Sequence, residues 1–525
     1  LYGVDINDES VEIAKLSLWL HTARKDRKLS DLNNNIKCGN SLINDPKVAG
    51  DKAFDWHKEF PDIMQAGGFD VVIGNPPYVF AREKIGQNEK DFYSKEYKSA
   101  EYQFNTYMLF IERSIDLLKQ SALYGLIVPN SWLMVSSATK LRNFVLTSSN
   151  IKEIVNLTGY SFDNVNVETI IIISQKLKIE NNKIKILTNT EKETFSLLHT
   201  RKQDDFLANP NFEFKIYSDD VSKKITEKIL LNSEILDNLT IIKAGLQAYE
   251  KDKGNPRQTA EDVIKRPYDY NFKFDNETYP YLEGKDVQRN NISWDGLFLK
   301  YGNHLASPRS IDLFNDKKII VREITGTYPN CIIATYSEDL YLYNRSNIGI
   351  LERKDKNISL KYIVAMLNSK LISFYFLKNT AKSVRKMFPK IILNDLRLFP
   401  IKAISSLEQQ PFIFKSEIIL DLNKQLQDKK NKFQSRIKSN FALEKISTKL
   451  ESFHDHDFKT FVAELKKQKV SPTLKQQDEW EEYFNSYKKE INDLQAEIKK
   501  TDAEIDQMVY KLYELTEDEI RIVEG

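Results

Sequence analysis

The first part of the chain alternates short apolar runs with amphipathic segments. Residues 69–73, 124–129 and 151–157 have the length and the apolar composition of buried strands. Between the first two runs, residues 104–118 repeat apolar side chains every three or four positions, which is the spacing of a helix with one buried face. Residues 168–174 add a strand that pairs with the preceding one. This order predicts an α/β fold with a mostly parallel sheet that has a hairpin at its end.

Two further strand ends precede the first of these runs. The chain opens on a strand that ends in Asp5 and continues into a helix over residues 10–24. A second short strand breaks at Gly39-Asn40. By contrast, residues 80–102 are polar and rich in aromatic side chains, and we expect them to be mobile without a partner.

The second half of the chain has a different pattern. Residues 215–240 look helical, and residues 241–400 mix short strands with one clear helix at 360–377. From Trp480 to Leu512, apolar side chains keep a three/four spacing over many turns, which predicts a helical hairpin or a coiled coil. We expect four regions: an α/β domain at 1–185, a helical connection at 186–240, an α+β domain at 241–405 and a helical region at 406–525.

Composition limits the class of protein. No apolar run approaches the length of a transmembrane span, so we expect a soluble protein without a membrane partner. Cys38 and Cys331 are too few for a disulfide scaffold or a zinc site and fit a reducing compartment, the cytoplasm. The His-Asp-His-Asp stretch at residues 454–457 lacks further ligand spacing, so a polar helix start is favoured. Lys and Arg number 77 and Asp and Glu 75, so contact with nucleic acid must come from local basic patches.

The first apolar run continues into Gly74-Asn75-Pro76-Pro77-Tyr78. Gly74 and the two prolines turn the chain into a stiff loop, at the strand end where open α/β sheets bind ligands. Asn75 offers an acceptor and a donor, and the prolines lack N–H groups, which leaves nearby carbonyls free to accept. Such a loop can hold an amino group that is about to be alkylated. Taken alone, the motif fits a solvent-exposed loop after a strand equally well.

The two earlier strand ends carry polar residues as well. Asp5 stands where a doubly wound fold holds an acidic residue against ribose hydroxyls, although a single Asp there is more often a helix N-cap. The amide of Asn40 could contact an adenine edge, or Gly39-Asn40 could form a simple turn. Together with the Asn-Pro-Pro-Tyr loop they define a crevice at one edge of the sheet. Their co-occurrence favours a ligand site over three unrelated turns.

At these motifs the chain resembles the amino-methylating DNA methyltransferases, specifically the gamma-ordered, TaqI-like adenine-N6 enzymes of type IIG restriction-modification systems. The order and spacing of the blocks are specific, and the resemblance spans nearly the whole chain. The matching residues are Tyr2 to Ile6, Gly39 to Leu42, Phe69 to Tyr78, Gly125 to Trp132, Phe162 before Val165 and Thr169, Tyr281 to Val287, Leu367 to Leu371, and Val509 to Val523.

The resemblance implies a Rossmann-like methyltransferase sheet, then an α+β target recognition domain, then a C-terminal helical or coiled-coil region. Such an enzyme transfers a methyl group from S-adenosylmethionine to the amino group of an adenine flipped out of double-stranded DNA, and the transfer needs no metal. The residues that would bind this cofactor are Asp5, Ile6, Asn40 and Ser41, with Asp5 at the ribose hydroxyls and Asn40-Ser41 facing the adenine.

The catalytic loop implied by the resemblance holds the target base. Asn75 and the carbonyl of Pro76, which Pro77 follows, would accept hydrogen bonds from the target amino group. These acceptors pull the lone pair of the amino nitrogen out of ring conjugation as the transition state forms. Tyr78 would stack on the flipped base, with Phe162 on its other face.

One part of the family pattern is absent. Relatives carry a Gly-rich cofactor loop on a strand before Asp5, and this chain starts after it. In the family's sheet that strand lies between those ending at Asp5 and Asn75, so both neighbours would expose unpaired backbone. We expect this chain alone to bind S-adenosylmethionine poorly and to be inactive without the missing N-terminal segment, in which any nuclease of the parent protein would lie.

Target recognition would rest on basic residues set among Tyr, Phe and Asn in the second half of the chain. The densest basic patch is the one we expect to contact the DNA backbone, and it consists of Lys382, Arg385, Lys386 and Lys390.

Several alternatives stay open. Asn-Pro-Pro-Tyr loops also occur in protein-glutamine and RNA amino-methyltransferases, and cytosine-N4 enzymes use a related loop that usually begins with Ser. The long C-terminal module favours DNA as the substrate, and Asn75 favours adenine. The alternative from another class is a DNA-binding specificity fragment whose methyltransferase half is incomplete and inert.

Overall fold

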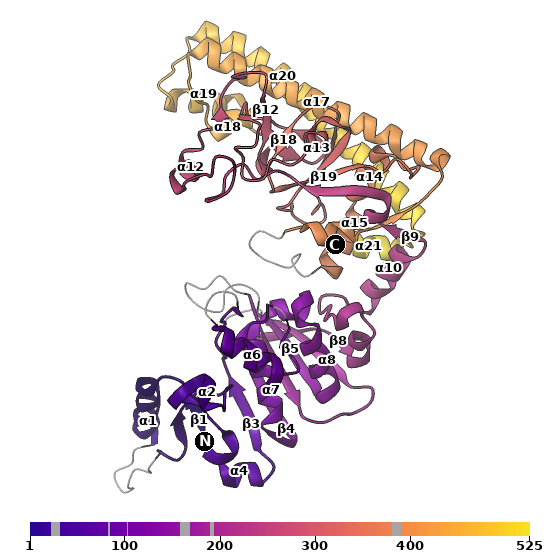
Figure 1. The fold of residues 1–525 in the computed structure, drawn as a ribbon. Helices are drawn as coiled ribbons and strands as arrows, with labels where there is room; N and C mark the ends of the chain where they lie inside the picture. The colour runs from indigo at the N-terminus through magenta and orange to yellow at the C-terminus, as the bar shows by residue number, and fades with distance from the viewer. Residues whose placement is uncertain (23–31, 82–84, 102, 158–167, 190–193, 381–389) are drawn as a thin grey trace. The chain divides into compact units, whose positions relative to one another are not determined.

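The computed structural model describes the chain except residues 23–31, 82–84, 102, 158–167, 190–193 and 381–389. The described chain forms two compact units, Leu1–Asp220 and Val221–Gly525, which we describe one at a time (Figure 1). Both units combine helices and strands, which confirms the predicted α/β class of the first unit and the α+β and helical character of the second.

The first unit is an α/β structure. Its strands are β1 Gly3–Asp5, β2 Ile36–Cys38, β3 Phe69–Gly74, β4 Leu118–Pro129, β5 Asn150–Leu157, β6 Thr169–Gln175, β7 Lys183–Asn189 and β8 Phe195–Lys202. Its helices include α1 Asp8–Thr22, α2 Pro46–Ala49, α3 Trp56–Glu59, α4 Pro61–Gln65, α6 Gln87–Glu96, α7 Thr106–Asp116, α8 Thr139–Ser148 and α9 Gln203–Leu207.

Six of these strands form one sheet in the order β3-β4-β6-β5-β7-β8, and β1 pairs with β2 in a separate parallel sheet. β3, β4, β5 and β7 point the same way, whereas β6 and β8 run against them. The predicted hairpin of β5 and β6 is present, but β6 lies between β4 and β5 and not at the end of the sheet. β6 contains four consecutive isoleucines from Ile170, and its central position buries Ile170 and Ile172 on one face and half-buries Ile171 and Ile173 on the other. The sheet continues through β7 and β8, past the expected boundary at residue 185.

Helices α7 and α8 pack on the sheet and share its core (Figure 1). Alternate residues of β4, namely Tyr124, Leu126 and Val128, are buried in one cluster with Tyr107 and Ile111 of α7. The helical spacing seen in the sequence therefore marks the buried face of α7, and this packing fixes the start of α7 close to the end of β3.

The stretch predicted to be mobile contains the helix α6. Its Tyr93 and the following Tyr97 are buried, and the Tyr97 hydroxyl donates a hydrogen bond to the carbonyl of Leu42 at 2.7 Å. The Arg113 guanidinium donates to the same hydroxyl oxygen at 2.6 and 3.0 Å. For the described part of this stretch, the prediction of mobility without a partner was wrong. Its aromatic side chains are buried inside the first unit.

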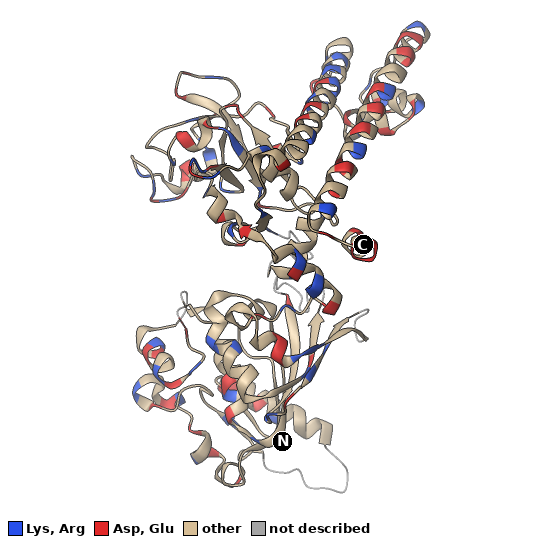
Figure 2. Ribbon diagram, turned by 90° about the vertical axis from the view of Figure 1, so that its right-hand side faces the viewer, with Lys and Arg blue, Asp and Glu red and all other residues tan. Residues whose placement is uncertain are grey.

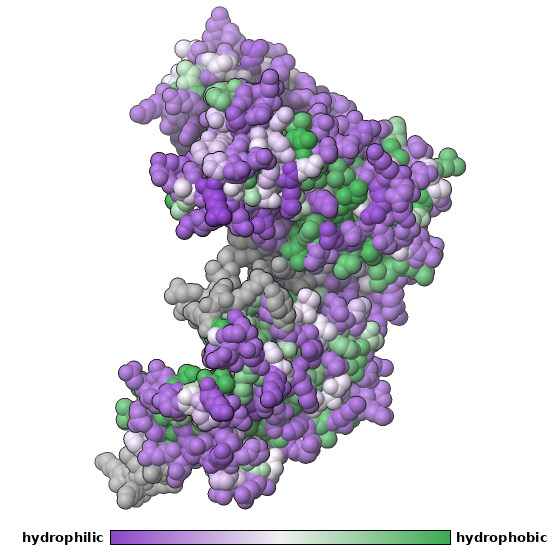
Figure 3. Space-filling model, viewed as in Figure 1, coloured by the Kyte–Doolittle hydropathy of each residue, from purple (hydrophilic) through white to green (hydrophobic). Residues whose placement is uncertain are grey.

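One edge of the large sheet is open in the described part of the chain, since β3 pairs only with β4 and β1 only with β2. On β3, Val71 is 57% exposed and Ile73 is 78% exposed. Figure 3 shows hydrophobic patches on one face of this unit. The two sheets are joined by an aromatic cluster in which the Tyr2 ring contacts Phe60 and Phe69, with centroids 5.4 and 5.9 Å away.

The second unit joins an α+β region to long helices. Its strands are β9 Ser233–Ile235, β10 Thr240–Ala244, β11 Asp269–Tyr270, β12 Thr278–Leu282, β13 Val287–Gln288, β14 Asn291–Ile292, β15 Phe298–Lys300, β16 Lys318–Arg322, β17 Ala334–Ser337, β18 Leu342–Tyr343, β19 Asn347–Glu352 and β20 Pro400–Lys402. Its helices are α10 Asp220–Leu230, α11 Leu236–Leu239, α12 Ala260–Lys265, α13 Asp312–Asn315, α14 Leu360–Leu367, α15 Lys370–Asn379, α16 Leu393–Arg397, α17 Ser406–Phe441, α18 Thr448–Glu451, α19 Phe458–Lys467, α20 Leu474–Leu512 and α21 Glu517–Glu524.

Two four-stranded sheets organise the α+β region, in the orders β10-β19-β16-β17 and β11-β15-β12-β18. The helix predicted at 360–377 is two helices, α14 and α15, bent by 63°. The bend falls at Asn368-Ser369, where the Asn368 amide donates to Asn290 at 2.7 Å and the Ser369 hydroxyl caps α15. No single helix in the described residues is long and apolar enough to cross a membrane. Only this bent pair reaches that length and composition, and most of its side chains are buried in the unit's core.

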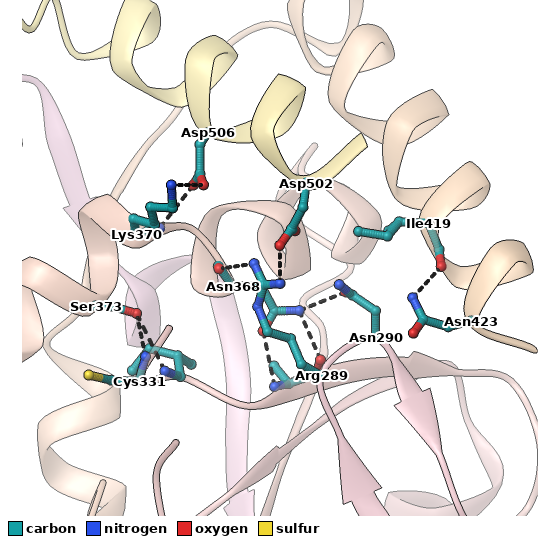
Figure 4. Close-up of polar contacts among 12 residues, drawn as sticks. Arg289, Asn290, Cys331, Asn368, Lys370, Ser373, Ile419, Asn423, Asp502 and Asp506 are labelled. Atoms are coloured by element: carbon teal, nitrogen blue, oxygen red, sulfur yellow. Dashed lines mark hydrogen bonds and ion pairs between the residues drawn. The ribbon is translucent and has the colours of Figure 1, made fainter. Parts of the chain in front are cut away.

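The predicted helical hairpin is present as α17 and α20, which pack along each other and carry charges of both signs (Figure 2). Asp457 is the N-cap of α19, which confirms the polar helix start predicted at residues 454–457. A buried polar junction fixes α20 to the α+β region (Figure 4). In it Arg289 pairs with Asp502, and Asp506 accepts a hydrogen bond from the backbone N–H of Lys370 at 2.9 Å.

Candidate functional site

The Asn-Pro-Pro-Tyr loop begins where β3 ends at Gly74. Pro76 is buried, whereas Asn75 and Pro77 are exposed and Tyr78 is half-buried. The Tyr78 hydroxyl lies 3.1 Å from Asn75 Oδ1 and 3.3 Å from the carbonyl oxygen of Ile127 on β4, and it can donate to either. The loop thus presents the Asn75 side chain to solvent with its oxygen oriented by a neighbouring hydroxyl.

Thr106, the first residue of α7, anchors the other side of this loop. Its Oγ1 donates to the carbonyl of Pro77 at 2.6 Å and accepts from the N–H of Val79 at 3.1 Å, while its own N–H donates to the Val79 carbonyl at 3.0 Å. The sequence-based reasoning missed this residue. The one sequence feature that could have indicated Thr106 is its place after Asn105, the N-cap of α7. Such a pair is common at helix starts, so it does not indicate contact with a distant loop.

The Tyr78 ring packs edge-on against Tyr107, with ring centroids 5.9 Å apart. Burial raises the pKa of the Tyr78 hydroxyl above its ordinary value, so the group stays protonated at neutral pH and remains a donor. The Tyr107 hydroxyl in turn lies 3.2 Å from Ser131 Oγ, just after β4. This chain of contacts fixes the ring of Tyr78 against the sheet.

Asp5 ends β1 next to the end of β2, and Ile6 follows the strand. Asp5 is exposed, and its Oδ1 accepts from the N–H of Asn7 at 2.8 Å. Its carbonyl accepts from the N–H of Gly39 at 2.8 Å, which holds the two strand ends together. Ile6 is 57% exposed beside it. Gly39 has no room for a side chain, because a Cβ there would lie 2.4 Å from the ring of Phe54.

Asn40 and Ser41 form the turn after β2. Asn40 Oδ1 accepts from the N–H of Leu42 at 3.0 Å, and the Ser41 carbonyl accepts from the Trp56 indole at 3.0 Å. The side-chain oxygen of Asn40 therefore shapes its own turn. The Asn40 side chain also forms a hydrogen bond with the Tyr93 hydroxyl. Burial raises the pKa of that hydroxyl to about 12, and the hydrogen bond opposes the rise.

Contacts at both ends show how these strand ends are arranged within the first unit. Tyr2 and Phe69, at the starts of β1 and β3, touch each other. Beyond the other ends, Leu42 and Ala81 are buried in one cluster, against which Tyr78 packs. The structure therefore brings the carboxyl ends of β1, β2 and β3 to one edge, as the sequence-based crevice requires.

The remaining predicted residues fall partly outside the described chain. Phe162, Lys382, Arg385 and Lys386 lie outside the described residues. Lys390 is described: its Nζ lies 3.1 Å from a carboxylate oxygen of Glu323, so its charge has a partner.

Lys390 also lines a cavity of about 530 Å³ in the second unit that the sequence did not reveal. Gly245 makes it possible, because a Cβ there would lie 2.3 Å from the carbonyl of Asn344. This close approach places Arg345 beside Gln247, with Nη1 and Oε1 3.4 Å apart. The polar lining residues are Gln247, Tyr249, Arg266, Tyr281, Glu283, Glu323, Asn344, Arg345, Ser346 and Lys390.

Comparison with known families assigns these regions to one class of protein. Residues 1–162 match the Eco57I restriction-modification methylase family, and residues 279–401 match the TaqI-like C-terminal specificity domain. Residues 405–509 match a domain of unknown function. The chain is therefore homologous to the type II restriction-modification enzymes and methyltransferases, and the resemblance to TaqI-like type IIG enzymes is confirmed.

Individual relatives agree with this class. RM.MjaORFECS2P of Methanocaldococcus jannaschii, a putative type II restriction enzyme and methyltransferase, is 26% identical over 352 residues, which are 67% of this chain and 28% of that protein. The type II restriction enzyme and methyltransferase RM.Eco57I of Escherichia coli is 30% identical over 259 residues, which are 46% of this chain and 25% of that protein. The chain thus spans about a quarter of the length of these two relatives.

A solved structure shares the fold. The type IIL restriction-modification enzyme MmeI, determined in complex with DNA, superposes with a TM-score of 0.58 at 12% identity. The match covers 99% of this chain and 64% of that one. At this identity the likeness concerns the fold alone.

Proposed function

We propose that the chain carries the methyl-transfer and DNA-recognition parts of a site-specific DNA adenine-N6 methyltransferase. The substrate is double-stranded DNA and the methyl donor is S-adenosylmethionine. The observation that carries this proposal is the anchored loop after β3, where Asn75 stays exposed while Tyr78 and Thr106 hold the chain on both sides. An acceptor held in place before the substrate arrives is what electrostatic stabilisation of a reacting amino group requires.

The loop acts on the target amino group through its acceptors. Asn75 Oδ1 and the Pro76 carbonyl would accept hydrogen bonds from the two N–H bonds of the target amino group, which favours turning the nitrogen lone pair out of conjugation with the base. Tyr78 keeps Asn75 oriented through its hydroxyl and offers its ring to the extruded base. Phe162 is proposed for the opposite face of that base.

The residues at the ends of β1 and β2 fit the methyl donor. S-Adenosylmethionine supplies an activated methyl group. Asp5 uses one carboxylate oxygen for Asn7 and is exposed, so the other can accept from a ribose hydroxyl. Ile6 offers an exposed apolar contact, and Asn40 shapes the turn in which Ser41 would face the adenine ring.

The cavity of the second unit is the proposed site for reading DNA. Of the cations that line it, Arg266 pairs with Glu283 at 3.0 Å and Lys390 with Glu323 at 3.1 Å. Arg345 is exposed, and within the described residues its guanidinium donates one side-chain hydrogen bond, to the neutral Gln247 Oε1 at 3.4 Å. An Arg and an amide side by side can contact base edges or phosphates, and the basic stretch at 382–390 would add backbone contacts.

The decisive experiment replaces Asn75 by Ala in the protein expressed from its own gene. We expect methyl transfer to DNA to fall about 100-fold or more, the usual cost of removing one preorganised group from a transition state. Binding of S-adenosylmethionine, measured by calorimetry, should change little. Asn143→Ala is a matched control, because Asn143 is an exposed asparagine on α8. Full turnover of the Asn75 variant would contradict the proposal, and sequencing of the product would separate N6-adenine from N4-cytosine methylation.

A second candidate function is a DNA-binding specificity protein without methyl transfer. The open edge of β3, with Ile73 78% exposed, favours it, because the sheet that should hold the cofactor is unpaired there in the described residues. DNA binding without any methyl transfer in the same assay would select this candidate.

A further inference from the structure

The helical hairpin contains a groove that belongs neither to the catalytic loop nor to the cavity proposed for reading DNA. It lies between α17 and α20 and has a volume of about 370 Å³. The region belongs to the segment that matches a domain of unknown function. The lining residues are Lys432, Arg436 and Asn440 from α17, and Glu479, Trp480, Tyr483 and Tyr487 from α20.

The side of the groove formed by α17 is basic by sequence and by helical spacing. Residues 429–443 contain four lysines and one arginine and no Asp or Glu. Lys432, Arg436 and Asn440 follow each other at intervals of four residues, so they lie on one face, about 6 Å apart along the helix axis. The sequence thus places a row of hydrogen-bond donors along one wall.

Of the five cations in this stretch, the two that line the groove lie outside ion pairs in the described residues. Lys429 pairs with Glu490 of α20, and Lys430 is half-buried, which lowers the pKa of its ammonium group. Lys432 and Arg436 are exposed, and within the described residues no ion pair involves either of them. The charge of Lys432 also helps to lower the pKa of Glu490, the partner of Lys429. Exposed cations outside an ion pair can still bind an anion from solution.

The other wall of the groove is aromatic and partly polar. Lys432 and Arg436 lie near enough to the Tyr483 hydroxyl that their charges oppose the rise in its pKa, which burial and Tyr487 bring to about 12. That hydroxyl therefore stays protonated beside the two cations, with a hydrogen bond to the Tyr487 hydroxyl. Glu479, also in the lining, makes the net charge of the groove one positive and not two.

We infer that this groove binds the sugar-phosphate backbone of double-stranded DNA outside the recognition cavity. Lys432 and Arg436 each neutralise a phosphate. One N–H of the Asn440 amide donates to the Arg436 carbonyl at 3.0 Å, and the other donates to a phosphate oxygen, while the Tyr483 ring forms part of the opposite wall. Arg, Lys, Asn and Tyr are the side chains that make such contacts, which position a protein on DNA without selecting a sequence. The inference rests on the proposed function, in that DNA is the substrate, and it adds a second, sequence-independent contact surface on the helical hairpin.

The test is the salt dependence of DNA binding by the full chain. In Lys432→Gln/Arg436→Gln, the affinity for duplexes of unrelated sequence should fall by a similar factor for each. The slope of log affinity against log salt should become less steep by about 1.8, which is about 0.9 for each lost phosphate contact. Fluorescence anisotropy with labelled duplexes between about 50 and 200 mM salt measures both quantities. Both residues are exposed, and circular dichroism checks that the fold is kept.

The matched control removes two positive charges from the same hairpin outside the groove, in Lys438→Gln/Lys475→Gln. Both lysines are exposed and neither lines the groove. The inference is overturned if the groove variant keeps the parental slope, or if the control reduces the slope by as much. It is also overturned if poly-glutamate binds the parent as tightly as DNA does, because the groove would then be a general anion site or a site for acidic peptides.

The result of this salt-dependence test can be distinguished from the result of the methyl-transfer test of the proposed function. A protein that binds DNA through this groove but never transfers a methyl group keeps the inference and loses the function. A protein that methylates DNA with an unchanged salt slope in the groove variant keeps the function and loses the inference. The Asn75→Ala variant should retain the parental slope in either case.

Discussion

Asp506 lies at the junction that fixes α20 to the α+β region, and replacing it by Asn should change how stability depends on pH (Figure 4). Its side chain is 2% exposed, and Oδ1 accepts from the N–H of Lys370. The buried Oδ2 has no hydrogen bond but lies 3.7 Å from the Lys370 ammonium. Burial raises the pKa of this carboxyl from 3.8 to about 6, with Asp502 adding to the rise and Lys370 and Arg289 opposing it. The ionised form is therefore disfavoured in the folded protein.

The sign of the effect follows from the raised pKa. Between pH 3.8 and about 6 the folded protein holds a proton on Asp506 that the unfolded chain has released. The contribution of this group to stability is complete below pH 3.8 and is lost as the pH rises to about 6. A shift of about two pH units corresponds to about 3 kcal/mol. An Asn at this position keeps the acceptor for Lys370 and cannot ionise, so it should avoid this loss.

Urea unfolding followed by tryptophan fluorescence at several values between pH 4 and pH 7 measures the effect. The free energy of unfolding of Asp506→Asn minus that of the parent should increase by up to about 3 kcal/mol across this range and level off above about pH 6. Asp493→Asn, an exposed aspartate on the same helix, serves as control and should run parallel to the parent. Parallel curves for Asp506→Asn and the parent would refute the reasoning, because they would mean that Asp506 ionises alike in folded and unfolded chains.

Two predictions concern the first unit. Thr106→Val removes the hydroxyl contacts to Pro77 and Val79, so the first unit should lose about 1–3 kcal/mol of stability. Methyl transfer should fall more than cofactor binding does, and Thr106→Ser should restore it. Equal turnover in the Val variant would show that the anchor is dispensable. The isolated chain should bind S-adenosylmethionine only weakly in calorimetry, because the facing edges of β1 and β3 are unpaired in the described residues. A submicromolar dissociation constant would be incompatible with that reason.

Much of the first unit could be predicted from local pattern. Apolar runs with strand composition gave β3, β4 and β5, and the three/four spacing gave α7, because both signals depend only on neighbouring residues. The place of β6 could not be predicted, since pairing partners are chosen by long-range burial. Helix α6 was missed because Tyr93 within it and Tyr97 just after it are buried, and Tyr97 contacts a residue distant in sequence, Leu42.

The candidate site shows the same division. Its polar strand ends, Asp5, Asn40 and Asn75, were visible in the sequence because a motif at a strand end is a local signal, and the structure brings them to one edge. Thr106 was not identified, and Arg345 was noted only as one of the basic residues set among Tyr, Phe and Asn. Their roles come from contacts with Pro77 and Gln247, and the second of these pairs is almost a hundred positions apart in the chain.

By itself, then, the sequence determined the class of fold, the order of the motifs and the family they resemble, because periodicity, loop-forming prolines and motif order are properties of the chain read in one dimension. Only the tertiary structure decided which strands pair, which hydroxyl anchors the loop and which cations lie outside ion pairs. Those properties depend on which distant residues share a small volume, and burial free energy summed over the whole core settles that.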